Sequence, residues 1–149
     1  MIRCTDNAVE LLRDAVRFDR AVRDGLADVV RASCEDGAEE ARRVGAFKDQ
    51  SGALRGSIVG RASGLDGEIE ATAEHASFVE DDTRPHEIVP RRAKMLRWED
   101  GDGVHFAHRV MHPGTKGKPF MGPASLKAER ALEARATVLL ARLGDRFSG

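Results

Sequence analysis

Residues 112–124 limit what this chain can fold into more than any other stretch. They hold three prolines and three glycines in thirteen positions, and a long amphipathic pattern follows them. Proline lacks a backbone N–H and fixes φ, whereas glycine reaches conformations that other residues avoid, so the segment predicts a loop of defined shape. It contains no nucleophile beside a base, and we therefore expect it to contact a neighbour rather than to perform chemistry.

The composition indicates one soluble domain that spans residues 1–149. Charged residues make up 33% of the chain but balance to a net charge of -1, so the basic footprint of a DNA-binding protein is missing. Aromatic residues are only 5%, which supplies base stacking poorly. There is no apolar run of membrane-spanning length and no signal-peptide core. Cys4 and Cys34 lack CxxC spacing, and we expect reduced thiols in an intracellular protein.

Two segments have helical periodicity. Residues 7–44 carry two apolar stripes at helical spacing, formed by Val9, Leu12 and Val16 and then by Val22, Leu26, Val29 and Val30. Gly25 interrupts this pattern, so one long helix and two helices with a bend remain alternatives. Residues 123–143 predict a second helix, with Gly144 as its stop.

Between these helices the period changes to two. Residues 68–74 alternate polar and apolar side chains, and residues 57–62 form a weaker strand, joined to them by a hairpin at Leu65-Asp66-Gly67. A second hairpin joins residues 94–98 to 104–110. An extended polar loop, residues 81–92, separates the two hairpins. The chain therefore predicts an α+β fold: an antiparallel sheet of about four strands within residues 56–110, with both helices packed on one face.

Three segments, taken in order, resemble a known family. Residues 49–58, Asp-Gln-Ser-Gly-Ala-Leu-Arg-Gly-Ser-Ile, resemble the Thr/Ser-Gly-x-Leu-Arg-x-Ser-Ile signature after the first long helix of the tail-completion, or neck, proteins of long-tailed double-stranded DNA phages. Residues 112–124 are similar to that family's His-Pro-Gly-Thr-x-x-x-Pro-Phe-x-x-Pro-Ala start of the last helix. These two matching segments lie on either side of the third one in the sequence.

The middle segment covers residues 76–98. Ala-Ser-Phe-Val-Glu, then His-Glu-Ile-Val-Pro and Lys-Met-Leu-Arg-Trp, are similar to the family's Tyr/Phe-Val-Glu-Phe-Gly-Thr, His-x-Ile-x-Pro and Lys-x-Leu-x-Trp/Phe strand and loop. One departure is plain, because Asp81 and Asp82 replace the usual aromatic residue and glycine before Thr83. The departure bears on the turn at this point and on its contact with a neighbouring subunit. The matches together run over roughly half of the chain.

The resemblance implies a structural protein of the virion, not an enzyme, that is assembled in the host cytoplasm. Such proteins form a homo-oligomeric ring at the head–tail junction, which ends the tail tube or joins it to the head connector. A hexamer is favoured, with a dodecamer as the alternative. The implied partners are other copies of the chain, the tail-tube protein, connector or stopper proteins and genomic DNA, which passes through a central channel without sequence-specific binding. No cofactor and no membrane are implied.

A ring needs two different surfaces on each subunit, and stiff loops can supply them. We expect residues 81–92 and 112–122 to reach outward, because their prolines reduce the entropy lost on docking. The expected contact residues are Thr83, Arg84, Pro85, His86, Ile88, Pro90, His112, Pro113, Gly114, Thr115, Lys116, Pro119, Phe120 and Met121. For Phe120 the favoured alternative is a core position that seals the last helix onto the fold.

An acidic strand face is the candidate channel lining. Glu68, Glu70 and Glu74 alternate with apolar residues, so they would share one face. Negative charge along a channel repels phosphates and lets DNA slide. A solvated outer face is the favoured alternative for these three residues, because charged strand faces usually meet only water.

Two further functions remain as rivals. A small metal-dependent nuclease or hydrolase would use Asp81 and Asp82 with the histidines, and an adaptor would bind a peptide at the sheet edge. The spacing of His105, His108 and His112 is compatible with a metal site on a helix, but strand alternation points the first two to opposite faces. We therefore expect no catalytic residue and no metal ligand.

Overall fold

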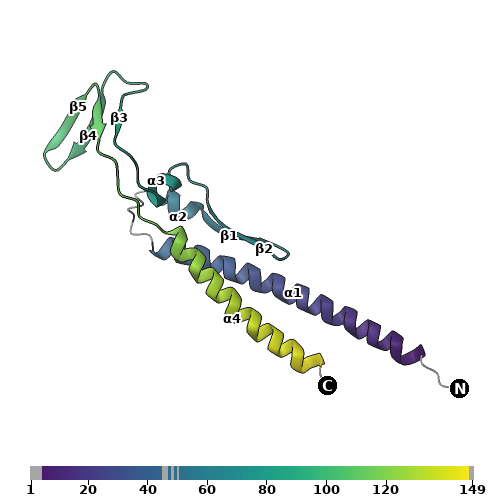
Figure 1. The fold of residues 1–149 in the computed structure, drawn as a ribbon. Helices are drawn as coiled ribbons and strands as arrows, with labels where there is room; N and C mark the ends of the chain where they lie inside the picture. The colour runs from purple at the N-terminus through teal and green to yellow at the C-terminus, as the bar shows by residue number, and fades with distance from the viewer. Residues whose placement is uncertain (1–4, 45–46, 48, 50, 148–149) are drawn as a thin grey trace.

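Two long helices dominate the computed structural model, which describes residues 5–44, 47, 49 and 51–147. Helix α1 (Thr5–Val44) and helix α4 (Met121–Phe147) lie side by side in an elongated molecule (Figure 1). Helix α1 is continuous, which decides between one helix and two. Gly25 does not break it but admits α4, since a Cβ there would lie 2.7 Å from Leu139 Cδ1.

Helix α4 is longer at both ends than residues 123–143. Gly144, the expected stop, lies inside the last turns of the helix. The helix continues because its final residues still have a surface to cover: Leu143 is buried, and the Phe147 ring meets Phe18 of α1 edge-on at 5.1 Å. None of the helices in the described ranges is both long and apolar enough to span a membrane.

The α+β class is confirmed, but the single four-stranded sheet is wrong. The described residues form six short strands in three separate antiparallel pairs. These pairs are β1 (Ile58–Ser63) with β2 (Asp66–Ala71), β3 (His86–Ile88) with β6 (Val110–His112), and β4 (Leu96–Asp100) with β5 (Gly103–Ala107). Strand β3 lies inside the expected loop 81–92, and the expected strand 104–110 is divided between β5 and β6.

The β1–β2 hairpin packs directly on α1. Two glycines of the hairpin allow the close approach: a Cβ on Gly60 would collide with the Cys34 carbonyl, and one on Gly67 would lie 2.7 Å from Val30 Cγ1. Larger side chains would hold the hairpin away from the helix. The chain reverses at Gly64, whose φ of 61° falls in the left-handed region, so the turn begins one residue before Leu65.

A small core lies at one end of the helix pair. Here α1 meets α2 (Ala53–Ser57), α3 (Ala76–Glu80) and the start of α4. Helix α3 replaces the strand that the resemblance implied. The fully packed side chains are Ala38, Ala41, Phe47, Leu54, Ile58, Ala76, Phe120 and Ala124. Elsewhere the elements pack only two layers deep, and many large apolar side chains are exposed.

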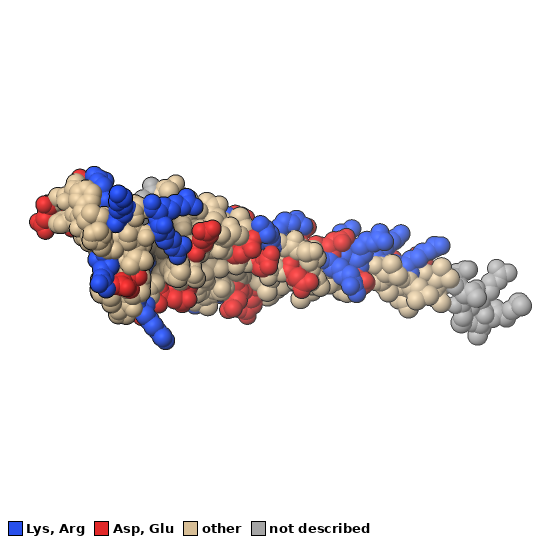
Figure 2. Space-filling model, turned by 90° about the horizontal axis from the view of Figure 1, so that it is seen from above, with Lys and Arg blue, Asp and Glu red and all other residues tan. Residues whose placement is uncertain are grey.

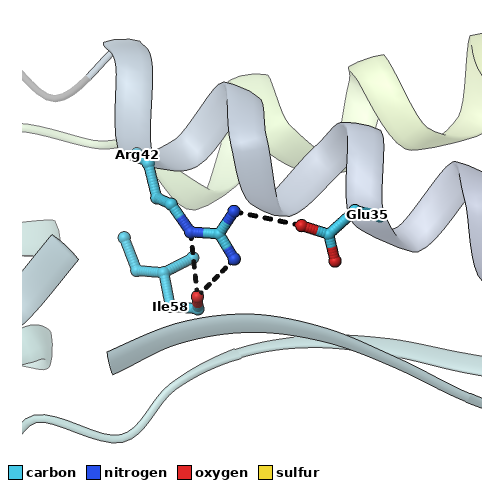
Figure 3. Close-up of polar contacts among 3 residues, drawn as sticks. All are labelled: Glu35, Arg42 and Ile58. Atoms are coloured by element: carbon cyan, nitrogen blue, oxygen red, sulfur yellow. Dashed lines mark hydrogen bonds and ion pairs between the residues drawn. The ribbon is translucent and has the colours of Figure 1, made fainter. Parts of the chain in front are cut away.

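Arg42 fastens α1 to the beginning of the β1–β2 hairpin (Figure 3). Its Nε and Nη2 donate to the Ile58 carbonyl at 3.1 and 2.8 Å, and its Nη1 pairs with Glu35 at 3.1 Å. The planar guanidinium reaches all three contacts at once. It therefore fixes where the hairpin starts along the helix.

Candidate functional site

The two segments expected to project separately are joined to each other. Strands β3 and β6 pair antiparallel, with His86 opposite His112. Beyond the end of this pair, Thr83 and Thr115 form a further β-bridge. The Thr83 N–H donates to the Thr115 carbonyl at 2.9 Å, and the Thr115 N–H donates to Thr83 Oγ1 at 2.7 Å. Residues 79–88 and 110–121 thus make one structure, which we call the tethered ribbon.

Two carboxylates hold together the part of the tethered ribbon that lies next to α3 and the start of α4. Asp82 Oδ1 accepts the Gly117 N–H at 2.7 Å, and Glu80 Oε2 accepts the N–H groups of Phe120 and Met121 at 2.8 and 3.1 Å. The Lys118 N–H donates to the Val79 carbonyl at 2.7 Å. The first N–H groups of a helix have no partner within the helix, and Glu80 supplies an acceptor for those at the start of α4. Its negative charge also interacts favourably with the positive end of the helix dipole.

Glycine is required where the strands of the ribbon come closest. Gly114 has a φ of 87°, and a Cβ there would collide with the Thr83 carbonyl. A Cβ on Gly117 would lie 2.6 Å from the Glu80 carbonyl oxygen. The loop composition that marked residues 112–124 in the sequence therefore serves close approach to residues 80–83.

The paired histidines have defined tautomers. The Gly114 N–H donates to His112 Nδ1 at 3.1 Å, so this nitrogen carries no proton and Nε2 carries it in the neutral ring. His86 Nδ1 lies 2.9 Å from the Arg84 carbonyl, which only accepts, so this nitrogen is the donor. The two ring centroids are 5.2 Å apart. The two rings therefore lie against each other where β3 pairs with β6.

Exposure divides the expected contact residues into three groups. Eight are exposed and available to a partner: Arg84, Pro85, His86, Ile88, Pro113, Thr115, Lys116 and Pro119. Thr83, Pro90, His112, Gly114 and Met121 are half-buried. Phe120 is the single fully buried one, at 1% exposure.

Phe120 belongs to the core, as the favoured alternative held. Its ring meets Phe47 edge-on at a centroid distance of 5.2 Å, and its N–H is taken by Glu80. An aromatic ring enclosed in this way contributes to the stability of the subunit. It offers no surface to a neighbour, so we do not retain it among the contact residues.

The acidic row is shorter than expected. Strand β2 ends at Ala71, so Glu74 lies outside it and does not share its face. Glu68 and Glu70 do share the face turned away from α1. Glu70 pairs with Arg61 of β1, which neutralises part of the charge. A channel lining would consist of Glu68 and this ion pair rather than of three free carboxylates.

The residues considered for metal chemistry are dispersed. His105 Nε2 contacts Asp100 Oδ1 at 2.9 Å, His108 Nδ1 lies 3.3 Å from the Lys94 carbonyl, and His112 serves Gly114. Asp82 is occupied by Gly117. Among the residues that the structure describes, no three His, Cys, Asp or Glu side chains come together in a way that could hold a metal ion.

Sequence reasoning missed the role of Glu80 and Asp82. Asp82 stood out only beside Asp81, and Glu80 only within the middle matching segment, although both precede the glycine- and proline-rich loop whose N–H groups need acceptors. It also missed Asp100, where the Asp102 N–H, and after it His105, lowers the pKa of the carboxyl group. The Trp98 ring stacks on His105 at 5.3 Å, so the β4–β5 hairpin carries its own polar cluster.

The structure has an α+β fold in which a long helix pair carries the tethered ribbon and many large apolar side chains are exposed. Comparison with protein-family models, with curated proteins and with solved structures gave no match for this chain. The resemblance of residues 49–124 to phage neck proteins consequently rests on their sequence motifs alone.

Proposed function

We propose that this chain is a structural, ring-forming component of a phage head–tail junction. It ends the tail tube or joins it to the head connector, around a channel through which DNA passes. It assembles with other copies of the same chain and contacts the tail-tube and connector proteins, and it binds no cofactor.

One observation carries the proposal: the three segments that resemble the neck family converge. Leu54 and Ile58 come from the first, Ala76 from the second, and Phe120 and Ala124 from the third, and all five belong to one core. The tethered ribbon then ties the second segment to the third. Segments that pack into a single unit support a common origin better than scattered matches would.

The surface of the molecule supports an assembly role as well. Large apolar side chains are exposed along α1, on the β4–β5 hairpin and on α4, including Leu11 at 72%, Leu12 at 67% and Phe106 at 60%. Exposed apolar surface of this extent marks sites of protein contact, because leaving it in water is unfavourable. Two different surfaces on an elongated subunit also suit the head-to-tail interfaces of a ring.

The test images the purified full chain, alone and mixed with tail tubes polymerised from the tube protein of the same genome. We expect negative-stain electron microscopy and native mass spectrometry to show closed rings, or a ring on the tube end. A monomer that ignores the tubes and cleaves DNA with a divalent metal, with the cleavage lost in Asp81→Ala, would establish the nuclease rival instead.

The exposed face of the tethered ribbon is tested by point changes. Deleting residues 81–92 would remove β3 and the Asp82 tether, so a deletion cannot separate folding from contact. Arg84→Glu with Lys116→Glu reverses two exposed charges and spares these bonds. We expect loss of tube binding with unchanged circular dichroism, whereas Arg91→Glu with Arg92→Glu should bind as wild type. Tube binding that survives the first pair would remove the ribbon face from the interface.

A further inference from the structure

Each end of the elongated molecule carries an apolar surface: arginines rim the groove at one end, and acidic residues form the hairpin tip at the other. At one end α1 extends beyond α4, whose last described residue, Phe147, reaches only Phe18. The α1 arm, residues 8–20, is exposed along its whole length in the described part of the chain, although Phe18 meets Phe147. A groove on this arm combines apolar side chains with a basic rim and is lined by Val9, Leu12, Arg13, Val16, Arg17 and Arg20.

The apolar stripe of the arm continues a face of α1 that a β-hairpin already covers. Val9, Leu12 and Val16 fall on the same side of the helix as Val30 and Cys34, because their spacing follows the 3.6-residue period. Farther along, that side lies against the β1–β2 hairpin, where Gly67 approaches both Val30 and Cys34. The arm therefore presents to solvent a helix face of the kind that receives a hairpin in this fold.

The β4–β5 hairpin at the other end fits this requirement. One of its faces carries Val104 and Phe106, which are 46% and 60% exposed, across from Glu99 and Arg97. Its tip adds Asp100 and Asp102, so the hairpin end is acidic. Figure 2 shows acidic atoms at the tip of this end with basic atoms directly behind them, and both basic and acidic atoms toward the N-terminal end of α1.

We propose that the β4–β5 hairpin of one copy docks on the α1 arm of the next. Phe106 and Val104 then pack against Leu12 and Val16, and Glu99 and Asp102 face Arg13 and Arg20. This contact is heterologous, since hairpin and arm are different surfaces, and repeating it links copies head to tail until a ring closes. The inference rests on the proposed function and names the pair of surfaces that would build its ring.

Complementary charge reversal tests the contact in the full chain. Arg13→Glu with Arg20→Glu reverses the arm, and Glu99→Arg with Asp102→Arg reverses the hairpin. All four side chains are exposed, so folding should be unchanged by circular dichroism. In sedimentation velocity we expect each variant to associate about tenfold or more weakly than wild type, because like charges then meet across the contact.

An equimolar mixture of the two variants makes the test specific. Each reversed arm then finds a reversed hairpin, and we expect association to return toward the wild-type level. Arg91→Glu with Arg92→Glu applies the same charge change outside both surfaces and should associate as wild type. Wild-type association by either contact variant alone, or no recovery in the mixture, would overturn the proposed contact.

The same samples separate this inference from the function it rests on. A wild-type chain that stays monomeric at its highest soluble concentration overturns the contact between hairpin and arm. Tail-tube binding, scored by electron microscopy, decides the head–tail role independently, since a subunit can cap a tube by other surfaces.

Discussion

Glu80 holds the start of α4 through Phe120: its Oε2 accepts the Phe120 N–H at 2.8 Å across 40 positions of sequence. The same oxygen accepts the Met121 N–H. The side chain of α3 thus does what a local capping residue does in other helices, and it does so while Phe120 is drawn into the core. The Glu80 carboxylate thus links the start of the helix, the ribbon and the core.

Replacing Glu80 should therefore destabilise the subunit. For Glu80→Ala we expect a loss of about 2 kcal/mol in the free energy of unfolding, because two helix N–H groups lose a charged acceptor. Urea denaturation followed by circular dichroism measures it. Glu74→Ala removes an exposed glutamate nearby and should change stability by less than about 0.5 kcal/mol. Equal effects for the two variants would contradict the capping role.

At Gly37, α1 approaches both α4 and the β1–β2 hairpin. A Cβ there would collide with Ile69 Cδ1 and lie 2.9 Å from the Ala124 carbonyl oxygen. We expect Gly37→Ala to cost about 1–3 kcal/mol, since overpacking outweighs the helix propensity that alanine adds.

Gly56→Ala supplies the control for this substitution. Gly56 lies in α2 with open space where its Cβ would be, so alanine should be neutral or slightly stabilising there. Thermal unfolding of both variants decides the matter. A stabilised Gly37→Ala protein would show that the helices and hairpin can move apart at no cost.

Arg42 should tolerate neither alanine nor lysine. Alanine leaves the Ile58 carbonyl without its two guanidinium donors, and lysine replaces the planar fork with a single ammonium nitrogen, so we expect each variant to lose about 1–2 kcal/mol. Arg31→Ala removes only an exposed pair with Asp28 and should cost less than about 0.5 kcal/mol. Full recovery of stability in Arg42→Lys would mean that charge alone, not the fork geometry, fastens the hairpin.

Asp100 should titrate below its ordinary pKa of 3.8, first because of the Asp102 N–H and then because of His105. A lowered folded-state pKa means that the carboxylate stabilises the hairpin tip above the ordinary value, and that this stabilisation is lost as the pH falls through the lower value. NMR titration of the carboxyl carbon measures the shift. His105→Ala should move the pKa back upward; an unchanged value would remove His105 as a cause.

The sequence foresaw the elements better than their arrangement. Helical periodicity located both long helices, and alternation with glycine turns located the β1–β2 and β4–β5 hairpins to within a few residues. These signals are local, so they survive without knowledge of packing. Strand β3 was missed because a strand of three residues with polar neighbours carries no periodic signal. Its pairing with β6 is accompanied by the Thr83–Thr115 bridge and by the bond from Gly117 to Asp82, which join residues more than 30 positions apart.

The candidate site shows the same division. Residues 112–124 were recognised as a shaped loop, since proline and glycine restrict the backbone wherever they occur. That the loop folds onto residues 80–88 instead of projecting alone could not be foreseen, because a carboxylate and a distant N–H group leave no pattern in sequence. Phe120 is an example. Its residue type is compatible with an interface anchor or with a core position, and only the residues around it in the folded chain decide between the two.

The amino-acid sequence by itself determined which segments are helix, hairpin or stiff loop, because those choices follow from side-chain periodicity and backbone restriction within a few residues. Only the tertiary structure decided that the strands form three separate pairs, that Glu80 and Asp82 bind the ribbon together, and that the α1 arm and the β4–β5 hairpin remain uncovered. Those outcomes depend on which surfaces meet in space, and contacts between residues 40 positions apart are set by the packing of the whole chain.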